Sequence, residues 1–429
     1  MTARKEARPV AQDFLGGGLF RAAVSGATGP PPPGMGADWE RLTMTTTEHS
    51  EIAKTEWAAI AGIIATVSVF AIAQGLSYPL LSFILQRQGV SPGLIGLSAA
   101  MTPIGFIVSS PLIPSLSRRF GAGRTALSCA ALSAVMLFLI GWTQDVYAWF
   151  LLRFLLGVVT NPLYVLSETW MIALAPPARR GRFMGVYSTI ISAGFAAGPL
   201  CLLAVGTQGW PPFMVGILAF AACGLCLALV LRRLPEFDET GHQVSVLGFV
   251  PLAWVLLFAV VVAAGFEQGA LALLPVYGTG YGIGEASMSA LLSVMIAGNI
   301  ALQVPLGLLA ERISARKVRL ACAAATALGC AMLPFLIVTP FVWPFVFVWG
   351  AVSYGIYTMT IIELGETFSG ARLVAGNAAF SLMWGVGGIA VPPVAGAAMD
   401  VLGAPGLPIT LGLMCLMLAI LSAARLRAS

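Results

Sequence analysis

The sequence predicts an all-α polytopic membrane protein with twelve transmembrane helices in two six-helix parallel repeats. Hydrophobic residues make up 58% of the 429 residues and charged residues only 10%, and the mean hydropathy is +0.91. These values exclude an ordinary soluble domain. The apolar runs are about 20 residues long, which suits membrane-spanning helices rather than the shorter alternating strands of a membrane β-barrel. The third observation is a strong imbalance of positive charge between alternate loops.

Twelve apolar runs define the expected helices. The first six spans lie at about Trp57–Phe83, Leu94–Leu116, Arg124–Trp142, Val146–Trp170, Phe183–Val205 and Trp210–Leu231. The second six lie at about Val250–Leu274, Met288–Leu309, Val318–Val338, Phe341–Leu364, Val374–Ala397 and Leu407–Leu421. We therefore expect two six-helix bundles, at residues 56–231 and 248–429, joined by a polar cytoplasmic linker at residues 232–247. Residues 1–55, rich in Gly, Pro and charge, are expected to be a disordered cytoplasmic tail.

The distribution of Lys and Arg predicts the topology. With the N-terminus inside, 21 of the 23 cationic residues fall in the tail, the inner loops and the C-terminal end. Arg87 lies in an outer loop, and Arg153 lies within a helix. This asymmetry predicts an even number of spans, with both termini cytoplasmic, in a plasma (inner) membrane.

The two halves are related by an internal duplication. A shift of 193 residues superposes Gly105 on Gly298 and Gly157 on Gly350, among other identities. Each half begins on the same side of the membrane, so the repeats are parallel and related about an axis along the membrane normal.

Two loop segments carry a family signature. Residues 307–317 read Gly-Leu-Leu-Ala-Glu-Arg-Ile-Ser-Ala-Arg-Lys, and residues 114–124 form a divergent first copy with Pro114 and Arg118 at the positions of the first Gly and the acid. The pattern Gly-x-Leu-Ala-Asp-Arg-x-Gly-x-Arg-Lys is the loop signature of the major facilitator superfamily, which the chain resembles from Trp57 to Leu426. The resemblance implies a secondary transporter that works by alternating access. It also implies that these loops tie the two halves together at a cytoplasmic gate; the alternative is a plain topology signal. The gate candidates are Arg118, Arg119, Glu168, Glu311, Arg312, Arg316 and Glu363.

The fourth helix carries a polar stripe. Arg153, Gly157, Asn161, Tyr164 and Glu168 recur at spacings of 4, 4, 3 and 4 residues, which places them on one face. Arg153 and Gly157 resemble the helix-4 motif that is linked to proton coupling in some members of the superfamily. A buried Arg is costly in a membrane, so it marks a functional position by default. The alternatives are a fixed structural ion pair or a side chain that snorkels to the outer surface.

Glu267 is the expected partner of Arg153. Each lies about 7 residues, or roughly 10 Å, from the outer surface, on helices 4 and 7 of opposite halves. We expect an Arg–Glu pair across a central cavity, in which protonation of Glu267 releases Arg153. The other cavity candidates share polar or aromatic character, and each could instead form an interhelical hydrogen bond or a packing contact. They are Gln74, Tyr78, Asn161, Tyr164, Gln268, Asn299, Gln303, Tyr354, Tyr357, Asn377 and Trp384.

The fifth helix suggests the direction of transport. Gly194, Gly198 and Pro199 resemble the helix-5 motif of proton antiporters, although Gly-x-x-x-Gly is also a general close-packing signal. No phosphate loop, zinc-binding pattern or pair of catalytic carboxylates is present, so we expect no enzyme activity, cofactor, metal or nucleic-acid partner. The sequence predicts a monomer in the lipid bilayer that exports a small organic solute in exchange for protons. The alternatives are a proton-coupled uptake symporter for a sugar or other metabolite and a non-transporting ligand sensor.

Overall fold

The computed structural model describes residues 36–175, 180–235 and 247–428. The chain divides into two units, Met1–Trp57 and Ala58–Ser429. In the first unit the described residues, 36–57, are helical, whereas the tail was predicted to be disordered as far as residue 55. Residues 1–35 of that tail and residues 236–246 of the predicted linker lie outside the described residues. The expectations for those segments stay predictions.

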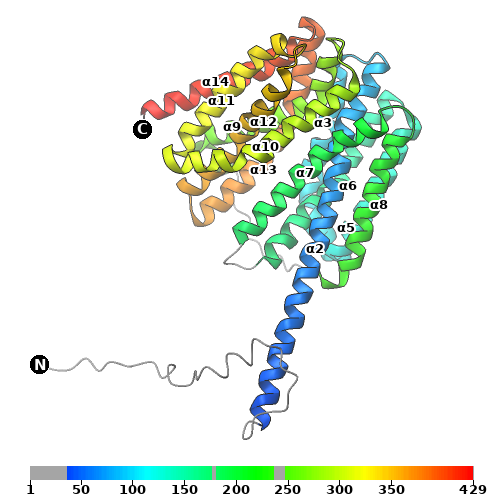
Figure 1. Ribbon diagram of the computed structural model, residues 1–429, viewed down its shortest axis with the longest axis vertical. Coiled ribbons are helices and arrows are strands. Elements are labelled where there is room, and N and C mark those ends of the chain that lie inside the picture. The colour runs from blue at the N-terminus through cyan, green and yellow to red at the C-terminus, as the bar shows by residue number, and fades with distance from the viewer. Residues whose placement is uncertain (1–35, 176–179, 236–246, 429) are drawn as a thin grey trace, which may run out of the picture. The chain divides into compact units, whose positions relative to one another are not determined.

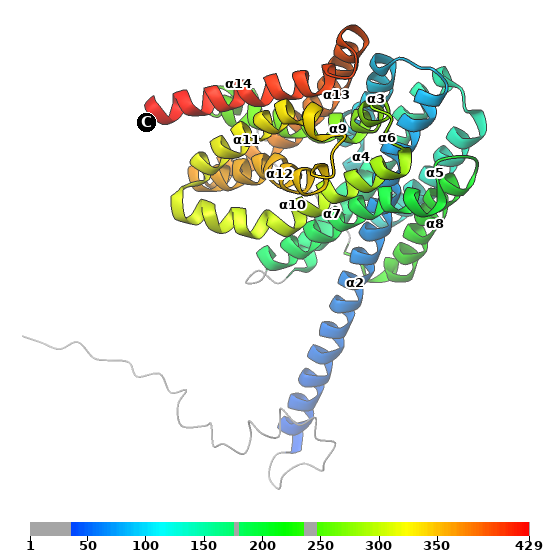
Figure 2. The same cartoon turned by 45° about the horizontal axis from the view of Figure 1, so that its top comes forward.

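The described residues are helical almost throughout (Figures 1 and 2). The N-terminal half contains α2 (Gly36–Arg87), α3 (Pro92–Ser109), η1 (Ser110–Leu112), α4 (Ile113–Phe120), α5 (Ala122–Thr143), α6 (Val146–Leu174), α7 (Arg180–Val205), α8 (Pro211–Val230) and η3 (Leu231–Arg233). The C-terminal half contains η4 (Leu247–Leu252), α9 (Trp254–Thr279), α10 (Glu285–Ile313), α11 (Ala315–Leu336), α12 (Val342–Thr367), α13 (Gly370–Leu402) and α14 (Gly406–Ala428). Twelve segments of the described chain are long and apolar enough to cross a membrane, which confirms the predicted number.

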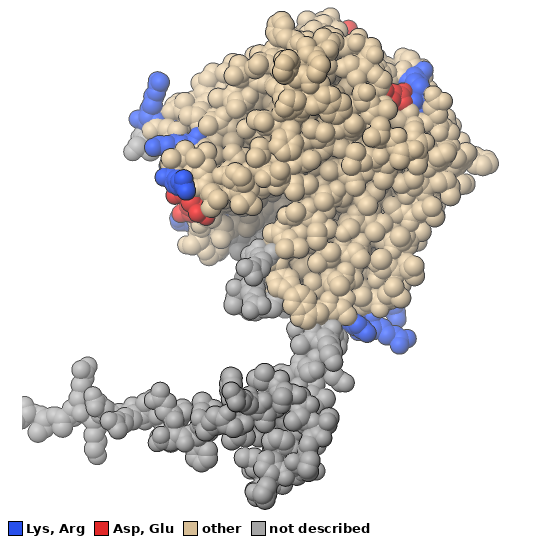
Figure 3. Space-filling model, viewed as in Figure 1, with Lys and Arg blue, Asp and Glu red and all other residues tan. Residues whose placement is uncertain are grey.

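The surface agrees with membrane insertion. Figure 3 shows a broad expanse without Lys, Arg, Asp or Glu, and the charged side chains visible in that view lie at its edges. Large apolar side chains such as Leu225, Leu229 and Phe335 are exposed on the helices. Lipid acyl chains accept such side chains at no cost, whereas water does not.

Glycine positions repeat in the two halves. A Cβ on Gly105 of α3 would lie 2.3 Å from the carbonyl oxygen of Phe154, and one on Gly298 of α10 would lie 1.8 Å from that of Phe347. The reciprocal contacts, of Gly157 on α6 and Gly350 on α12, are equally close. The helices at these crossings approach backbone to backbone, and only glycine allows such an approach. The duplication seen in the sequence therefore preserves the same helix crossing in each half.

The second span is interrupted where the sequence predicted one continuous helix. Between α3 and α4 the chain forms the 3₁₀ turn η1, next to Pro111 and Pro114. Proline has no N–H to donate, so the regular α-helical bonds fail at this point. Asn161 of α6 lies against this segment, where its Nδ2 is 3.0 Å from the carbonyl oxygen of Phe106 and 3.1 Å from Ser110 Oγ.

The two halves contact each other mainly through two helix pairs, α3 with α13 and α7 with α10, and to a smaller extent through α3 with α9. We call the end of the molecule where α2 ends and α10 begins the Arg87 face. The opposite end, with Arg118, Arg119, Arg312 and Arg316, is the Arg-rich face. Close contacts between α3 and α13 lie near the Arg87 face, where Cβ atoms on Gly96 and Gly396 would meet the carbonyl oxygens of Pro392 and Pro92 at 2.1 and 2.2 Å.

Contact between the halves continues toward the middle of the molecule. Ser293 of α10 donates to the carbonyl of Ala196 on α7 at 2.8 Å in the middle of that pair. Further toward the Arg-rich face, Cβ atoms on Gly185 of α7 and Gly307 of α10 would meet no atom within 4 Å. A Cβ on Gly370, the first residue of α13, also would meet nothing. The hydrogen bonds and the ion pair that join the halves within the described residues therefore lie at the Arg87 face and near the middle of α7 and α10.

Candidate functional site

Arg153 lies on α6 in the interior of the N-terminal half, with 1% of its surface exposed. Its Nη1 donates to Ser98 Oγ of α3 at 3.3 Å, and its guanidinium lies 5.9 Å from the centre of the Tyr78 ring on α2. Its Nε has no hydrogen-bond partner within the described part of the chain. An aromatic face stabilises a cation through its quadrupole, more strongly where water is absent. The N-terminal half thus holds this cation with neutral groups of its own.

Glu267 is a half-buried acid on α9 of the C-terminal half. Among the described residues it forms no ion pair, and no hydrogen bond of its side chain is present. Its carboxyl group lies within electrostatic range of the Tyr78, Tyr164 and Tyr354 hydroxyls. Arg153 and Glu267 thus approach the same Tyr78 from opposite halves, but the predicted ion pair between them is not formed in this conformation.

Aromatic side chains from both halves surround the acid. Tyr354 and Tyr357 belong to α12, and the Tyr357 ring lies edge-on to Trp384 of α13, with centroids 4.7 Å apart and planes at 67°. Tyr164 of α6 is 38% exposed, and its hydroxyl is within electrostatic range of Glu267 and Tyr357 in the other half. The exposed Tyr164 ring therefore borders the space between the halves. These residues can offer an organic solute both flat apolar surfaces and hydrogen-bonding hydroxyls.

Two other predicted cavity residues form hydrogen bonds between neighbouring helices. Asn161 lies in the contact of α6 with α3 and η1, where its Nδ2 is also 2.9 Å from Ser109 Oγ. Gln303 of α10 donates to Thr358 Oγ1 of α12. Both hydrogen bonds stay within one half, so they match the interhelical alternative that the sequence left open.

The remaining predicted cavity residues differ in exposure. Gln74 and Asn299 are buried, Gln268 is half-buried and Asn377 is exposed. Asn299 Oδ1 and Gln268 Oε1 are buried atoms that have no hydrogen-bond partner in the described chain. These two amides are free to accept a hydrogen bond from water or from a bound solute.

A buried ion cluster lies at the Arg-rich end of the C-terminal half. Glu363 of α12 is 1% exposed, and its carboxylate pairs with Arg316 Nε at 3.0 Å and with Nη1 of the buried Arg319. Both arginines belong to the first turns of α11. Glu363 and Arg316 were predicted as gate residues, but the cluster lies wholly within one half. Arg319 escaped the sequence analysis, because only the rotation of α11 directs its side chain inward.

The corresponding end of the N-terminal half lacks such a cluster. Glu168 is half-buried on α6 without a hydrogen-bond or ion-pair partner among the described residues. Arg118 Nη2 contacts Ser115 Oγ at 3.3 Å, and the Arg119 guanidinium lies 5.3 Å from the Phe120 ring centre. Glu311 and Arg312, in the second loop copy, are exposed. In this conformation none of these five gate candidates forms an ion pair with another described residue.

The helix-5 motif lies against the first span. A Cβ on Gly198 of α7 would lie 2.3 Å from the backbone nitrogen of Leu76, and one on Gly194 would lie 2.6 Å from Ala71 Cβ. Pro199 follows within the same helix. The motif therefore provides close contact between α7 and α2 inside the N-terminal half. This packing is compatible both with the antiporter motif and with a general close-packing signal.

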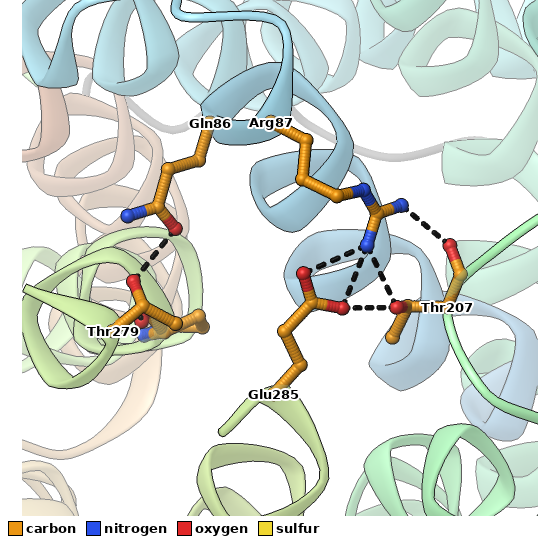
Figure 4. A network of polar contacts seen from close by, with 6 residues as sticks. Gln86, Arg87, Thr207, Thr279 and Glu285 are labelled. Carbon is orange, nitrogen blue, oxygen red and sulfur yellow. Dashed lines mark hydrogen bonds and ion pairs between the residues drawn. The ribbon is translucent and has the colours of Figure 1, made fainter. Parts of the chain in front are cut away.

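A polar network that the sequence analysis missed joins the halves at the Arg87 face (Figure 4). Arg87, the last residue of α2, pairs with Glu285, the first residue of α10, and both contact Thr207 in the loop between α7 and α8. Next to them, Thr279 of α9 donates to Gln86 Oε1 at 2.7 Å. The only signal in the sequence was the isolation of Arg87 as the one cation of an outer loop.

Comparison with known sequences identifies the family. A family model described as Major Facilitator Superfamily matches residues 63–366 and 256–429. The uncharacterized MFS-type transporter YfkF of Bacillus subtilis (strain 168) is 28% identical over 345 residues, which cover 78% of this chain and 86% of that protein. The uncharacterized MFS-type transporter Ent638_1421 of Enterobacter sp. (strain 638) is 22% identical over 312 residues, covering 72% and 80% of the two chains.

Solved structures share the fold. The nucleoside transporter NupG aligns with a TM-score of 0.72 at 14% identity, over 85% of this chain and 98% of that one. A bacterial homolog of the human lysosomal transporter Spinster, in an inward-facing and unoccupied conformation, aligns with a TM-score of 0.68 at 12% identity, over 86% and 96%. Together with the twelve spans and the paired repeats, these matches show that the chain is a membrane transporter that belongs to the major facilitator superfamily.

Proposed function

We propose that this transporter is a secondary active antiporter that exports a small organic solute in exchange for protons. The observation that supports the proposal most strongly is the environment of Glu267. Its carboxyl group is half-buried, has no counter-charge among the described residues and lies near tyrosines of both halves. Acids set inside membrane spans commonly carry protons in transporters.

In the proposed cycle Glu267 binds either a proton or the solute. The ionised carboxylate attracts a positively charged or hydrogen-bond-donating group of the solute, while Tyr357 and Trp384 contact its apolar part. Protonation removes the charge, so the solute leaves and the protonated site can cross a low-dielectric intermediate at a smaller cost. Rocking of the two halves then exposes the site to the other side of the membrane.

Arg153 is proposed to act together with Glu267 in the opposite conformation. In the present one Arg153 is satisfied by Ser98 and Tyr78, both in its own half. Because Glu267 lies within electrostatic range of the same Tyr78, a modest movement of α9 relative to α6 could bring the two charges together. Formation of that pair would compensate the charge of Glu267 after it has released its proton and before it binds the next solute.

The proposed direction rests on two sequence features. The topology predicted from the sequence puts 21 of the 23 Lys and Arg in the tail, the inner loops and the C-terminal end, so we propose that the Arg-rich face is cytoplasmic and that the membrane is the plasma (inner) membrane. The likeness of Gly194, Gly198 and Pro199 to the antiporter motif favours exchange over symport. Uptake by symport is the competing function, and both use the same acid.

Proton movement during solute efflux tests the proposal. A thermal-shift screen of the purified protein against metabolites and drugs first identifies a ligand. Proteoliposomes loaded with that ligand and a pH-sensitive dye are then diluted into ligand-free buffer. Antiport predicts that the lumen becomes acidic as the ligand leaves, whereas symport predicts that it becomes alkaline. Ligand binding without any efflux would instead indicate a sensor.

A further inference from the structure

Arg87, Glu285 and Thr207 form a closed set of polar contacts at the Arg87 face (Figure 4). Arg87 Nη1 lies 2.7 Å from both carboxylate oxygens of Glu285 and 2.8 Å from Thr207 Oγ1. Arg87 Nη2 donates to the Thr207 carbonyl at 2.7 Å, and Thr207 Oγ1 donates to Glu285 Oε2. The three side chains satisfy one another, and charge-assisted bonds of this kind are stronger than neutral ones.

The network connects the two halves. Arg87 and Thr207 belong to the N-terminal half, and Glu285 belongs to the C-terminal half. Within the described residues it contains the one ion pair that joins the halves, because the other two pairs both involve Glu363 and its own half. The two side chains are about one-third and one-quarter exposed, at 33% and 27%, so water can replace their contacts when they separate.

Both charges are favoured by the helices that carry them. Arg87 is the last residue of α2, where a cation is stabilised by the helix dipole, and Glu285 is the first residue of α10, where an anion is stabilised. The two helix ends therefore present complementary charges to each other. This arrangement also gives a reason for the one outer-loop cation in a chain that otherwise keeps Lys and Arg on the opposite side.

Neutral contacts reinforce the same closure. Thr279 of α9 donates to Gln86 Oε1, and Asp400 at the end of α13 accepts from the backbone N–H of Gly93 at 3.1 Å and from Ser91 Oγ at 3.2 Å. Each of these contacts also joins residues of opposite halves. Opening of the Arg87 face must break all of them, but only the Arg87–Glu285 contact separates two full charges.

We propose that the Arg87–Glu285–Thr207 network is the latch that holds the Arg87 face closed and sets the balance between the two conformations of the transport cycle. The latch is formed in the present conformation, and it breaks each time the transporter opens at the Arg87 face. The inference holds for either direction of transport and for any coupling ion. A failure of the latch would therefore leave the proposed proton antiport untouched, and a failure of the antiport would leave the latch untouched.

A distance measurement across the Arg87 face tests the latch. Tyr147 at the start of α6 and Val401 near the end of α13 lie in opposite halves at this face, and each is 83% exposed. Spin labels at Tyr147→Cys and Val401→Cys report how far the halves are apart in the full-length protein in lipid nanodiscs. The open-to-closed ratio at the Arg87 face should rise about three- to tenfold in Glu285→Gln.

The effects of the Arg87 and Glu285 substitutions on opening should also be non-additive. Arg87→Gln should open the face as much as Glu285→Gln, and the double variant should open it no further than either single one, because the same contact is lost in all three. Asp145→Asn is the matched control: Asp145 is an acid at the same face, but within the described residues its side chain accepts only from Ala148 N in the first turn of α6, at 2.8 Å. An unchanged ratio in Glu285→Gln, additive effects in the double variant, or an equal shift in Asp145→Asn would each overturn the proposal.

Discussion

The two halves of the transporter are alike in backbone contacts and unlike in charge. Gly105 and Gly157 in the first half make the same close approaches as Gly298 and Gly350 in the second. At the Arg-rich face, by contrast, the second half buries Glu363 between Arg316 and Arg319. The equivalent end of the first half has Glu168 without a cation among its described neighbours, because the residues that match Arg316 and Arg319 are Gly123 and Ala126.

This difference shows which features a duplicated bundle must keep. A glycine at a backbone crossing tolerates no side chain, so the helix pairs fix it in both copies. An ion cluster at a helix end can be lost if all of its members change, because only an unpaired buried charge is strongly penalised. The second half thus keeps a charged brace between α11 and α12, and the described residues of the first half show none.

The largest effect is expected from breaking this brace. Glu363→Gln leaves the buried Arg319 without its carboxylate, which should lower the free energy of unfolding by about 3–5 kcal/mol. Glu168→Gln, near the same end of α6 in the first half, should change it by less than about 1 kcal/mol. Thermal unfolding of the purified proteins in the same detergent measures both. Equal losses in the two variants would contradict the difference between the halves.

The shared glycines should respond alike. Cβ atoms on Gly157 and Gly350 would lie 2.2 and 2.0 Å from the carbonyl oxygens of Thr102 and Met295. Gly157→Ala and Gly350→Ala should therefore each destabilise the protein by about 1–3 kcal/mol, because the helices must move apart. Gly185→Ala and Gly307→Ala are the controls, since a Cβ there meets no atom within 4 Å. A large loss in the controls, or in only one of the two test variants, would show that the crossings are not equivalent.

Replacement of Arg153, the buried cation of the first half, should leave the free energy of unfolding almost unchanged but reduce the transport rate. Arg153 is held by Ser98 and Tyr78 rather than by a carboxylate, so Arg153→Met leaves no opposite charge unpaired in this conformation. We expect a change in unfolding free energy within about 1 kcal/mol and a loss of transport rate of at least about tenfold. Parallel thermal unfolding and proteoliposome assays separate the two effects. A wild-type transport rate in Arg153→Met would remove Arg153 from the proposed cycle.

The smallest effect is expected at the second loop copy. Glu311 is exposed at the Arg-rich end of α10, far along the chain from Glu267 and its aromatic neighbours. Glu311→Ala should slow turnover by about two- to fivefold while ligand affinity stays within about twofold, because a surface charge influences the conformational change more than the binding site. Binding and turnover measured on the same preparation check this. A selective loss of affinity would argue for a direct contact with the solute.

The sequence predicted the features that depend on local composition. The twelve spans follow from the length of the apolar runs, and the crossings at Gly105 and Gly298 follow from a repeat that is visible without coordinates. The second span was predicted as one helix, but Pro111 and Pro114 convert its middle into a 3₁₀ turn. Asn161 could not be distinguished in advance from a cavity residue, since its partners are the Phe106 carbonyl and the Ser109 and Ser110 hydroxyls of another span, and the sequence alone does not bring them together.

Features that depend on helix rotation, or on partners far apart along the chain, could not be predicted from the sequence. Arg319 turns inward to Glu363 on another helix, 44 residues away in the chain. Glu285 pairs with Arg87, which lies 198 residues earlier in the chain. Arg87 is the one cation that the predicted topology places in an outer loop. Arg153 and Glu267 were predicted to pair, and their shared proximity to Tyr78 keeps that prediction open for the opposite conformation.

The most direct test of the proposed antiport is ligand movement in proteoliposomes that contain Glu267→Gln, compared with wild type and with Glu366→Gln. Glu366 is an exposed acid at the end of α12, so it controls for the loss of one carboxyl group. The account predicts that Glu267→Gln loses ligand transport driven by a proton gradient but keeps ligand-for-ligand exchange in the absence of a gradient, whereas Glu366→Gln keeps both. Proton-driven transport that continues in Glu267→Gln at the wild-type rate would contradict it.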